Sequence, residues 1–120
     1  MLGKTTFVAV AALSLLLAAN SKVTNAQAKV KAGKFTEAIA ILEPMEATGG
    51  SEVRSALADA HLKYGDSFFN NANLPPRQKY RPALMQYRQA LKYDKANKAA
   101  MAKIKLIESI YKSMGMPIPQ

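Results

Sequence analysis

Apolar residues recur at intervals of three and four along most of the chain after residue 28. This spacing places them on one side of an α-helix. It is clearest in residues 35–45, 52–69, 80–93 and 98–114. No segment shows the sustained alternation of apolar and polar residues that is typical of a half-buried β-strand. The pattern therefore predicts an all-α protein.

Glycine, proline and asparagine separate these segments. Residues 70–78 contain three asparagines and a Pro-Pro pair, so we expect a loop there. The next helix is expected to begin near Tyr80, with Pro82 in its first turn, where a missing N–H group does no harm. Asn97 is placed to cap the last helix, and residues 115–120 are expected to form an extended tail.

The first residues follow a different pattern. Residues 7–19 carry no charge, Lys4 precedes them, and small polar residues follow them. That order is typical of a secretory signal peptide. As a helix this run would be about 20 Å long, which is shorter than the hydrocarbon core of a bilayer at about 30 Å. We therefore expect residues 1–28 to be a removable leader, with an uncleaved N-terminal membrane anchor or a buried core helix as alternatives.

The cleavage position is expected between residues 19 and 28. Small residues stand three and one before a cut at three places: Ala19 with Ser21, Thr24 with Ala26, and Ala26 with Ala28. The cuts after Ala26 and after Ala28 are favoured. The domain that remains, residues 29–114, has no cysteine, so its apolar core alone must hold it together.

Charge is unevenly distributed along the chain. The formal net charge is +9, and loss of Lys4 and Lys22 with the leader would leave +7. Residues 29–66 hold five basic and six acidic residues, whereas residues 77–105 hold nine basic residues against Asp94 alone. We expect six of these cations to form a basic surface: Arg81, Arg88, Lys92, Lys95, Lys98 and Lys105.

Basic residues mixed with tyrosines also occur in proteins that stack single-stranded nucleic acid on exposed rings. On the helix 80–93, however, Tyr80 and Tyr87 fall on the apolar face, and only Tyr93 stays on the polar side. We therefore interpret the basic surface as a solvated helix back, or as a contact for an acidic protein or an anionic membrane. Nucleic acid is not an expected partner.

Two segments resemble each other and a known repeat. GKFTEAIAILEPM (residues 33–45) and KYRPALMQYRQAL (residues 79–91) both place an alanine three residues after an aromatic ring, and a large apolar residue four further on. YRPALMQYRQALKYDKAN resembles the second helix of a tetratricopeptide repeat, and ALADAHLKYGD (residues 56–66) resembles the end of its first helix. The resemblance covers residues 22–114, about two and a half repeats, with an insertion after Asp66. It implies antiparallel helix pairs stacked as a short α-solenoid that binds a peptide or another subunit.

The resemblance also suggests which residues line the binding surface, all of them on the helix 52–69: Arg54, Leu57, Asp59, His61 and Tyr64. His61 is the only histidine, and without cysteines or clustered carboxylates it predicts no metal site. The sequence shows no base–nucleophile pair and no phosphate-binding glycine loop. We therefore expect neither an enzyme nor a cofactor.

Together these features predict an exported interaction or assembly module, in a bacterial periplasm or secreted. The expected partner is another protein or a peptide, and self-association is an alternative because a short repeat array exposes an apolar end. Two other classes stay open. One is an electrostatic binder of an anionic membrane or polyanion through the basic helices 80–112. The other is an enzyme subunit without an active site of its own.

Overall fold

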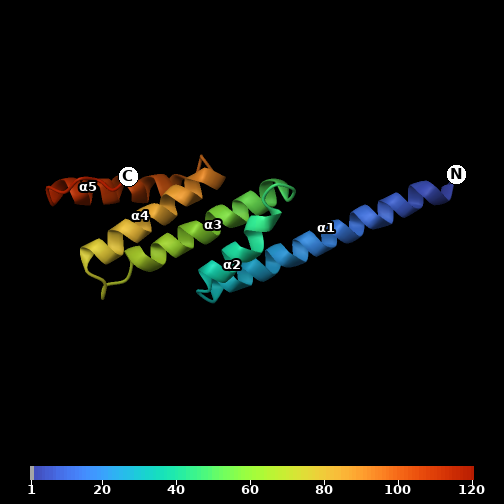
Figure 1. The fold of residues 1–120 in the computed structure, drawn as a ribbon, viewed down its shortest axis with the longest axis horizontal. Helices are drawn as coiled ribbons and strands as arrows, with labels where there is room; N and C mark the ends of the chain where they lie inside the picture. Colours follow the sequence, from blue (N-terminus) through green and yellow to red (C-terminus); the bar gives the residue numbers. More distant parts are fainter. Residues whose placement is uncertain (1) are drawn as a thin grey trace.

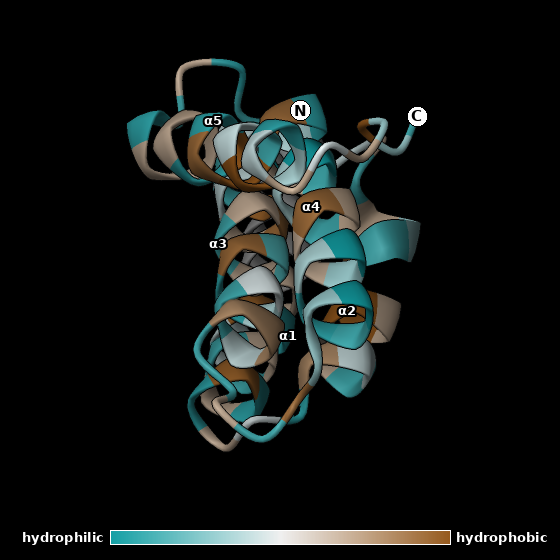
Figure 2. Ribbon diagram, turned by 90° about the vertical axis from the view of Figure 1, so that its left-hand side faces the viewer, coloured by the Kyte–Doolittle hydropathy of each residue, from teal (hydrophilic) through white to brown (hydrophobic). Residues whose placement is uncertain are grey.

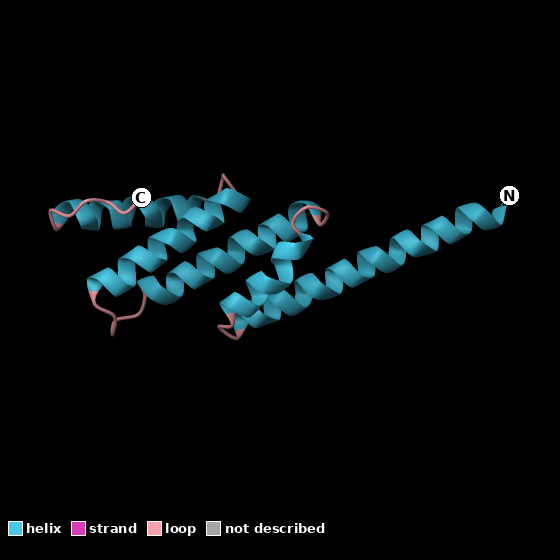
Figure 3. Cartoon of the chain, in the orientation of Figure 1, coloured by secondary structure: helices cyan, strands magenta, loops and turns pink. Residues whose placement is uncertain are grey.

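In the computed structural model, the backbone is described for residues 2–120 and the side chains for residues 17–120. This part of the chain forms α-helices and one short 3₁₀ helix, without a β-strand, which confirms the predicted all-α class (Figure 1; Figure 3). The helices are α1 (Leu2–Lys31), α2 (Phe35–Leu42), α3 (Gly50–Phe69), α4 (Pro76–Tyr93) and α5 (Lys98–Ser113), and the 3₁₀ helix η1 covers Glu43–Met45.

Consecutive helices pack side by side and antiparallel. α1 contacts α2, α3 contacts α4, and α4 contacts α5. In addition, α3 touches both α1 and α2, so it joins the N-terminal half of the molecule to the C-terminal half. The N-terminal part of α1 extends beyond the other helices (Figure 1), and the principal-axis extents are 72 × 25 × 18 Å.

Each half has its own apolar core. In the N-terminal core, Ala26 of α1 is buried together with residues of α2 and α3: Ala38, Leu42, Val53, Ala56 and Leu57. The C-terminal core is built by α4 and α5, from Ala83, Leu84, Tyr87, Ala90, Ala100, Ile107 and Tyr111. Figure 2 shows hydrophilic and hydrophobic residues alternating along the helices, as expected for amphipathic helices.

The apolar face predicted for the helix 80–93 is confirmed, with one correction. Leu84 and Tyr87 are fully buried, whereas Arg81 and Lys92 are exposed. Tyr93 does not stay on the polar side: its ring stacks on that of His61, with centroids 5.7 Å apart, and packs against the N-terminal core. The reason is that the last turn of α4 packs against α3, so α3 covers the Tyr93 side of the helix.

Helices α3 and α4 pack closely at Gly65. A Cβ atom on Gly65 would lie 2.7 Å from Cε1 of Tyr87, so the ring occupies space that any other residue would fill. The hydroxyl of Tyr87 donates a hydrogen bond of 2.6 Å to Oδ1 of Asp66. Burial of the ring, and then the hydrogen bond and the charge of Asp66, raise the pKa of Tyr87 well above its usual value.

Helix α4 begins earlier than the sequence suggested. It starts at Pro76 instead of near Tyr80, so the loop covers only residues 70–75 and Pro82 lies inside the helix. Pro76 occupies the first helical position, where its fixed φ angle suits a helix. Pro82 removes one backbone hydrogen bond, but the burial of its neighbour Leu84 in the C-terminal core favours continuation of the helix.

Helix α5 is capped at its start by Asn97 and is followed at its end by a tail that packs on the core. The Asn97 side chain caps the helix, because its Oδ1 accepts a hydrogen bond of 3.0 Å from the backbone N–H of Ala100. Residues 115–120 have no regular structure, but they turn back along α5 (Figure 3). Met116 and Ile118 pack against the C-terminal core, so this tail covers part of it.

Helix α1 runs without interruption across the predicted end of the leader at residue 28. The side chains of residues 1–16 are not described, so Lys4 and most of the apolar run 7–19 lie outside the described residues. Among residues 17–120, no helix is both long and apolar enough to cross a membrane.

Candidate functional site

A polar groove lies between α1 and α3. It consists of one cavity of about 830 Å³ and a neighbouring cavity of about 690 Å³, and Gln27 and Asp59 line both. The larger cavity is lined by Asn20, Val23, Thr24 and Gln27 from α1 and by Ser51, Glu52, Ser55, Ala56 and Asp59 from α3. The smaller one is lined by Gln27, Val30, Lys31, Phe35, Asp59, Lys63, Asp66, Ser67 and Asn70.

Helical spacing explains why these polar side chains face one another. On α1, Asn20, Thr24 and Gln27 follow at steps of four and three, so they share one face of the helix. On α3, Ser55 and Asp59 are four residues apart and share a face in the same way. Next to these polar faces, α1 and α3 pack together through apolar residues, and Ala26 of α1 is buried in one cluster with residues of α3. Burial of the apolar faces thus places the polar faces on either side of the groove.

The groove carries charges of both signs. Its acidic side chains are Glu52, Asp59 and Asp66, and its basic side chains are Lys31 and Lys63. Lys63 Nζ lies 4.0 Å from Oδ1 of Asp59, and both side chains are about half exposed. Such an exposed pair contributes little to stability, so both charged side chains can contact a ligand without a large loss of folding free energy. The amides of the groove offer donors and acceptors together, which suits the alternating N–H and C=O groups of a peptide backbone.

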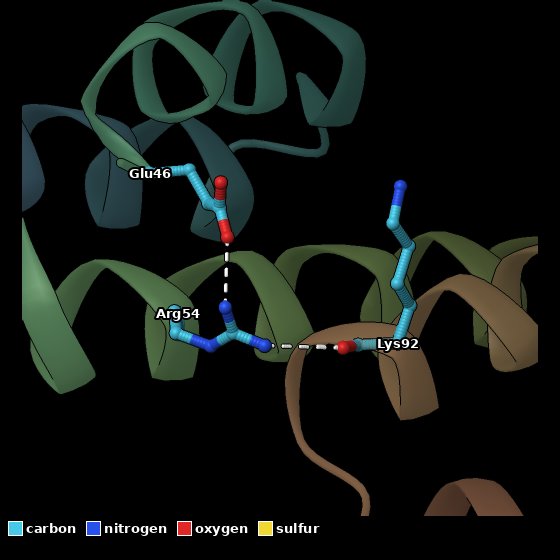
Figure 4. A network of polar contacts seen from close by, with 3 residues as sticks. All are labelled: Glu46, Arg54 and Lys92. Atoms are coloured by element: carbon cyan, nitrogen blue, oxygen red, sulfur yellow. Dashed lines mark hydrogen bonds and ion pairs between the residues drawn. The ribbon is translucent and has the colours of Figure 1, made fainter. Parts of the chain in front are cut away.

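The five residues predicted to bind a partner lie in different environments. Asp59 lines the groove, whereas Leu57 is fully buried in the N-terminal core. Arg54 contacts two other segments of the chain (Figure 4). Its Nη1 donates a hydrogen bond of 2.8 Å to Oε1 of Glu46, and its Nη2 donates one of 3.3 Å to the backbone oxygen of Lys92. Arg54 therefore links α3 to the segment after η1 and to the end of α4.

His61 and Tyr64 act as packing residues in this structure. His61 is buried, and its Nδ1 lies 2.8 Å from Oε1 of Gln86. Nε2 of the same ring is buried without a hydrogen-bond partner. The ring of Tyr64 stacks on Phe35 of α2, with centroids 5.3 Å apart. Of the predicted set, Asp59 is thus the residue that faces the groove.

The α1 side of the groove is not predicted by the sequence pattern used above. Asn20, Thr24 and Gln27 lie within the expected leader, so the sequence predicts no binding role for them. One signal in the sequence could have identified them: polar residues at steps of four and three directly after an apolar run. That spacing indicates a continuing helix with a polar face instead of an irregular segment.

The six cations of the predicted basic surface lie on α4, on α5 and in the turn between them. Arg88 is half-buried and the other five are exposed. Within residues 17–120, the ion pairs join Lys29 to Glu37, Arg54 to Glu46 and Lys63 to Asp59, and they leave the six cations unpaired. Lys92 Nζ lies 5.6 Å from the ring centroid of Tyr93, a weak attraction at an exposed site. The N-terminal half therefore neutralises several of its cations internally, and the basic surface does not.

The described residues therefore present two surfaces with distinct chemistry: the polar groove and the basic surface. No group of three or more His, Cys, Asp or Glu side chains among them could hold a metal ion. In comparisons with known proteins, no family model, no curated protein and no solved structure matches the chain.

Proposed function

We propose that this chain is an exported, tetratricopeptide-like interaction module without catalytic activity, in a bacterial periplasm or secreted. Its polar groove binds an extended segment of another protein. The observation that carries this proposal is the groove itself: about 830 Å³ of space between α1 and α3, lined by hydroxyl, amide and carboxylate groups. That volume falls within the range of about 300–1,000 Å³ that is typical of ligand clefts.

The burial pattern supports the repeat relationship. Ala38 and Leu42 of α2 and Ala83 and Tyr87 of α4 are the positions that the two similar segments equate, and all four have exposed fractions of 0%. The helix pair α3–α4 stacks on the pair α1–α2 through α3, which touches both earlier helices. This is the nearest-neighbour stacking expected of a helical repeat protein. In such stacking the first helices of the two pairs, α1 and α3, come to lie side by side.

The chemistry of the groove supports a peptide ligand over a single ion. An extended peptide has an N–H and a C=O group at most residues, and each needs a partner when water is excluded. Gln27 and Asn70 provide side-chain amides for this purpose, and Ser51 and Ser55 provide hydroxyls. The mixture of acidic and basic side chains would favour a segment that itself carries both charges.

A photo-crosslinking amino acid at Ser55 tests this proposal in cells. Ser55 is exposed and lines the groove, and Ser109, which is also exposed but lies on α5, provides the matched control position. We expect irradiation to join the Ser55 variant to one or a few proteins, identified by mass spectrometry, and the Ser109 variant to none of them. Identical products from both positions, or no product from Ser55, would contradict the groove as the binding site.

A charge reversal provides a second test. Asp59→Lys changes a side chain of the groove, whereas Glu43→Lys makes the same change at an exposed residue of η1 that does not line it. The crosslinked product should weaken with Asp59→Lys and persist with Glu43→Lys. Equal effects of the two substitutions would show that the response depends on net charge and not on the groove.

A second candidate function is supported by the unpaired cations of the basic surface. In this alternative, the chain binds an anionic membrane or polyanion through α4 and α5. Apolar side chains accompany the cations on α5, where Met101 is 36% and Leu106 is 47% exposed. Lysines beside exposed apolar side chains suit the boundary between lipid headgroups and acyl chains.

Vesicle sedimentation separates this candidate from the groove. Binding to vesicles with anionic lipid should exceed binding to neutral vesicles and should fall as salt rises from low to moderate concentration. The double substitution Arg88→Glu with Lys92→Glu should abolish it, while Asp59→Lys should leave it intact. Unchanged binding after the double reversal would exclude the electrostatic candidate.

A further inference from the structure

The first helix pair depends on side chains that lie within the expected leader. Ala26 is fully buried in the N-terminal core, and Val23 and Val30 pack against the same core. Further upstream, Leu17 is 60% exposed, and Ala18, Asn20 and Ser21 are exposed as well. The buried part of α1 therefore begins at about Val23, inside the range in which the leader is expected to end.

The three cuts that the small residues allow have different consequences for this core. A cut after Ala28 would leave Lys29–Lys31 of α1, which is less than one helical turn of about 3.6 residues. A cut after Ala26 would also remove Val23 and Ala26 from the core. Either cut would remove Ala26, the α1 residue that is buried in one cluster with Ala38 and Leu42, and would leave α2 without its antiparallel neighbour.

A cut after Ser21 keeps this packing. Lys22 to Lys31 would remain as a helix of about 15 Å at 1.5 Å per residue, and it would carry Val23, Ala26 and Val30. The ion pair between Lys29 Nζ and Glu37 Oε2, at 3.2 Å, would remain beside the turn that joins α1 to α2. The groove would lose Asn20 but would keep Val23, Thr24 and Gln27 on its α1 side. Ala19 and Ser21 provide the small residues three and one before this cut.

We infer that the leader is removed between Ser21 and Lys22, so that the mature domain begins at Lys22 and retains the buried part of α1. This inference rests on the export that the proposed function includes. It replaces the cuts after Ala26 and Ala28 that the sequence alone favoured. The mature protein then retains both helices of the first pair, so that they can pack on each other and on α3 as in a helical repeat.

The test is to express the full chain in an exporting bacterium and to determine the N-terminus and intact mass of the product. The expected N-terminus is Lys22. A product that begins at Gln27 or Lys29 would overturn the inference. A product that keeps Met1 would overturn it as well, because the leader would then not be removed.

Two matched substitutions test the cleavage position in a second way, in addition to the N-terminus of the unaltered chain. Ser21→Leu places a bulky residue directly before the inferred cut, whereas Ala28→Leu does the same for the alternative cut after Ala28. Both positions are exposed on α1, so neither change disturbs the core. We expect loss of the Lys22 product with Ser21→Leu alone. Its persistence in that variant, or its loss with Ala28→Leu, would contradict the inference. The crosslinking at Ser55 is read separately, so failure of the cut position is distinguishable from failure of the groove.

Discussion

Replacing Gly65 by alanine should destabilise the protein, although alanine is the better helix former. In an exposed helix the change would stabilise by about 0.8–1.0 kcal/mol. At Gly65, however, the added Cβ would lie 2.7 and 2.9 Å from Cε1 and Cδ1 of Tyr87. Tyr87 has an exposed fraction of 0%, so its ring cannot move aside without displacing neighbouring buried atoms.

The magnitude follows from two opposing effects. Overpacking a buried site of this kind costs about 1–3 kcal/mol. Movement of the ring would also stretch the hydrogen bond of 2.6 Å from the Tyr87 hydroxyl to Asp66, and bonds to charged groups contribute about 1.5–3 kcal/mol. After subtraction of the gain in helix propensity, we expect a net loss of about 1–2 kcal/mol. For a domain of this size, each kcal/mol corresponds to a fall in Tm of about 4–8 °C.

Urea unfolding followed by circular dichroism measures this loss, and a double-mutant cycle assigns it. Tyr87→Leu removes the ring, so Gly65→Ala in that background should become neutral or stabilising by up to about 1 kcal/mol. Tyr87→Phe keeps the ring, and it therefore serves as the control in which the steric part of the penalty persists. A stabilising Gly65→Ala in the presence of Tyr87, or effects that simply add within about 0.5 kcal/mol, would refute the steric explanation.

Three further predictions concern individual contacts. Because burial raises the pKa of Tyr87, the hydroxyl stays protonated, and its bond to Asp66 stays formed, well above pH 10 in the folded protein. The unfolded tyrosine ionises near pH 10, so the contribution of Tyr87 to the free energy of unfolding is complete below about pH 10 and decreases as the pH rises through the raised pKa. Native wild type and Tyr87→Phe should accordingly show the same tyrosinate absorbance up to about pH 11 and differ by one tyrosinate once unfolded, and a native difference near pH 10 would contradict this. Asn97→Ala removes the cap on Ala100 and should cost about 1 kcal/mol of unfolding free energy, whereas Asn97→Ser should recover most of it; equal losses for both would show that capping is not the cause. Arg54→Gln should cost about 0.2–1 kcal/mol at low salt and less at high salt, since both partners of the pair with Glu46 are well exposed, and a cost that does not depend on salt would argue against an ionic contribution.

The inward face of α4 could be predicted because local rules and packing agree there. Leu84 and Tyr87 lie three residues apart, and the charged residues of α4 occupy the other side of the helix. The face with Leu84 and Tyr87 is therefore the one that can be buried, and it is buried in the structure. The start of α4 could not be predicted in the same way. The Pro-Pro pair is typical of a loop, but Pro76 also suits the first position of a helix, so the local sequence permits either arrangement.

The groove was only partly predictable, for a different reason. Small residues are required before a signal-peptidase cut and are also favoured where helices pack closely. Ala26 therefore fits a cleavage site or a helix contact equally well, and only its burial distinguishes the two. The link from Arg54 to Lys92 spans 38 positions, and no local pattern reveals such a contact. Asp59 was identified because it lies on the helix for which the repeat resemblance suggested a surface.

The division of the apolar interior into two cores bears on how the molecule opens. Because the buried apolar residues form two separate clusters, we expect two cooperative units in native-state hydrogen exchange. Helix α3 belongs to both units, and Tyr93 and Arg54 couple them across it. A ligand that contacts both α1 and α3 would stabilise the N-terminal unit against opening and would leave the stability of the C-terminal unit unchanged. Occupation of the groove should therefore appear as slowed amide exchange in α1 and α2, with the amides of α5 exchanging as before.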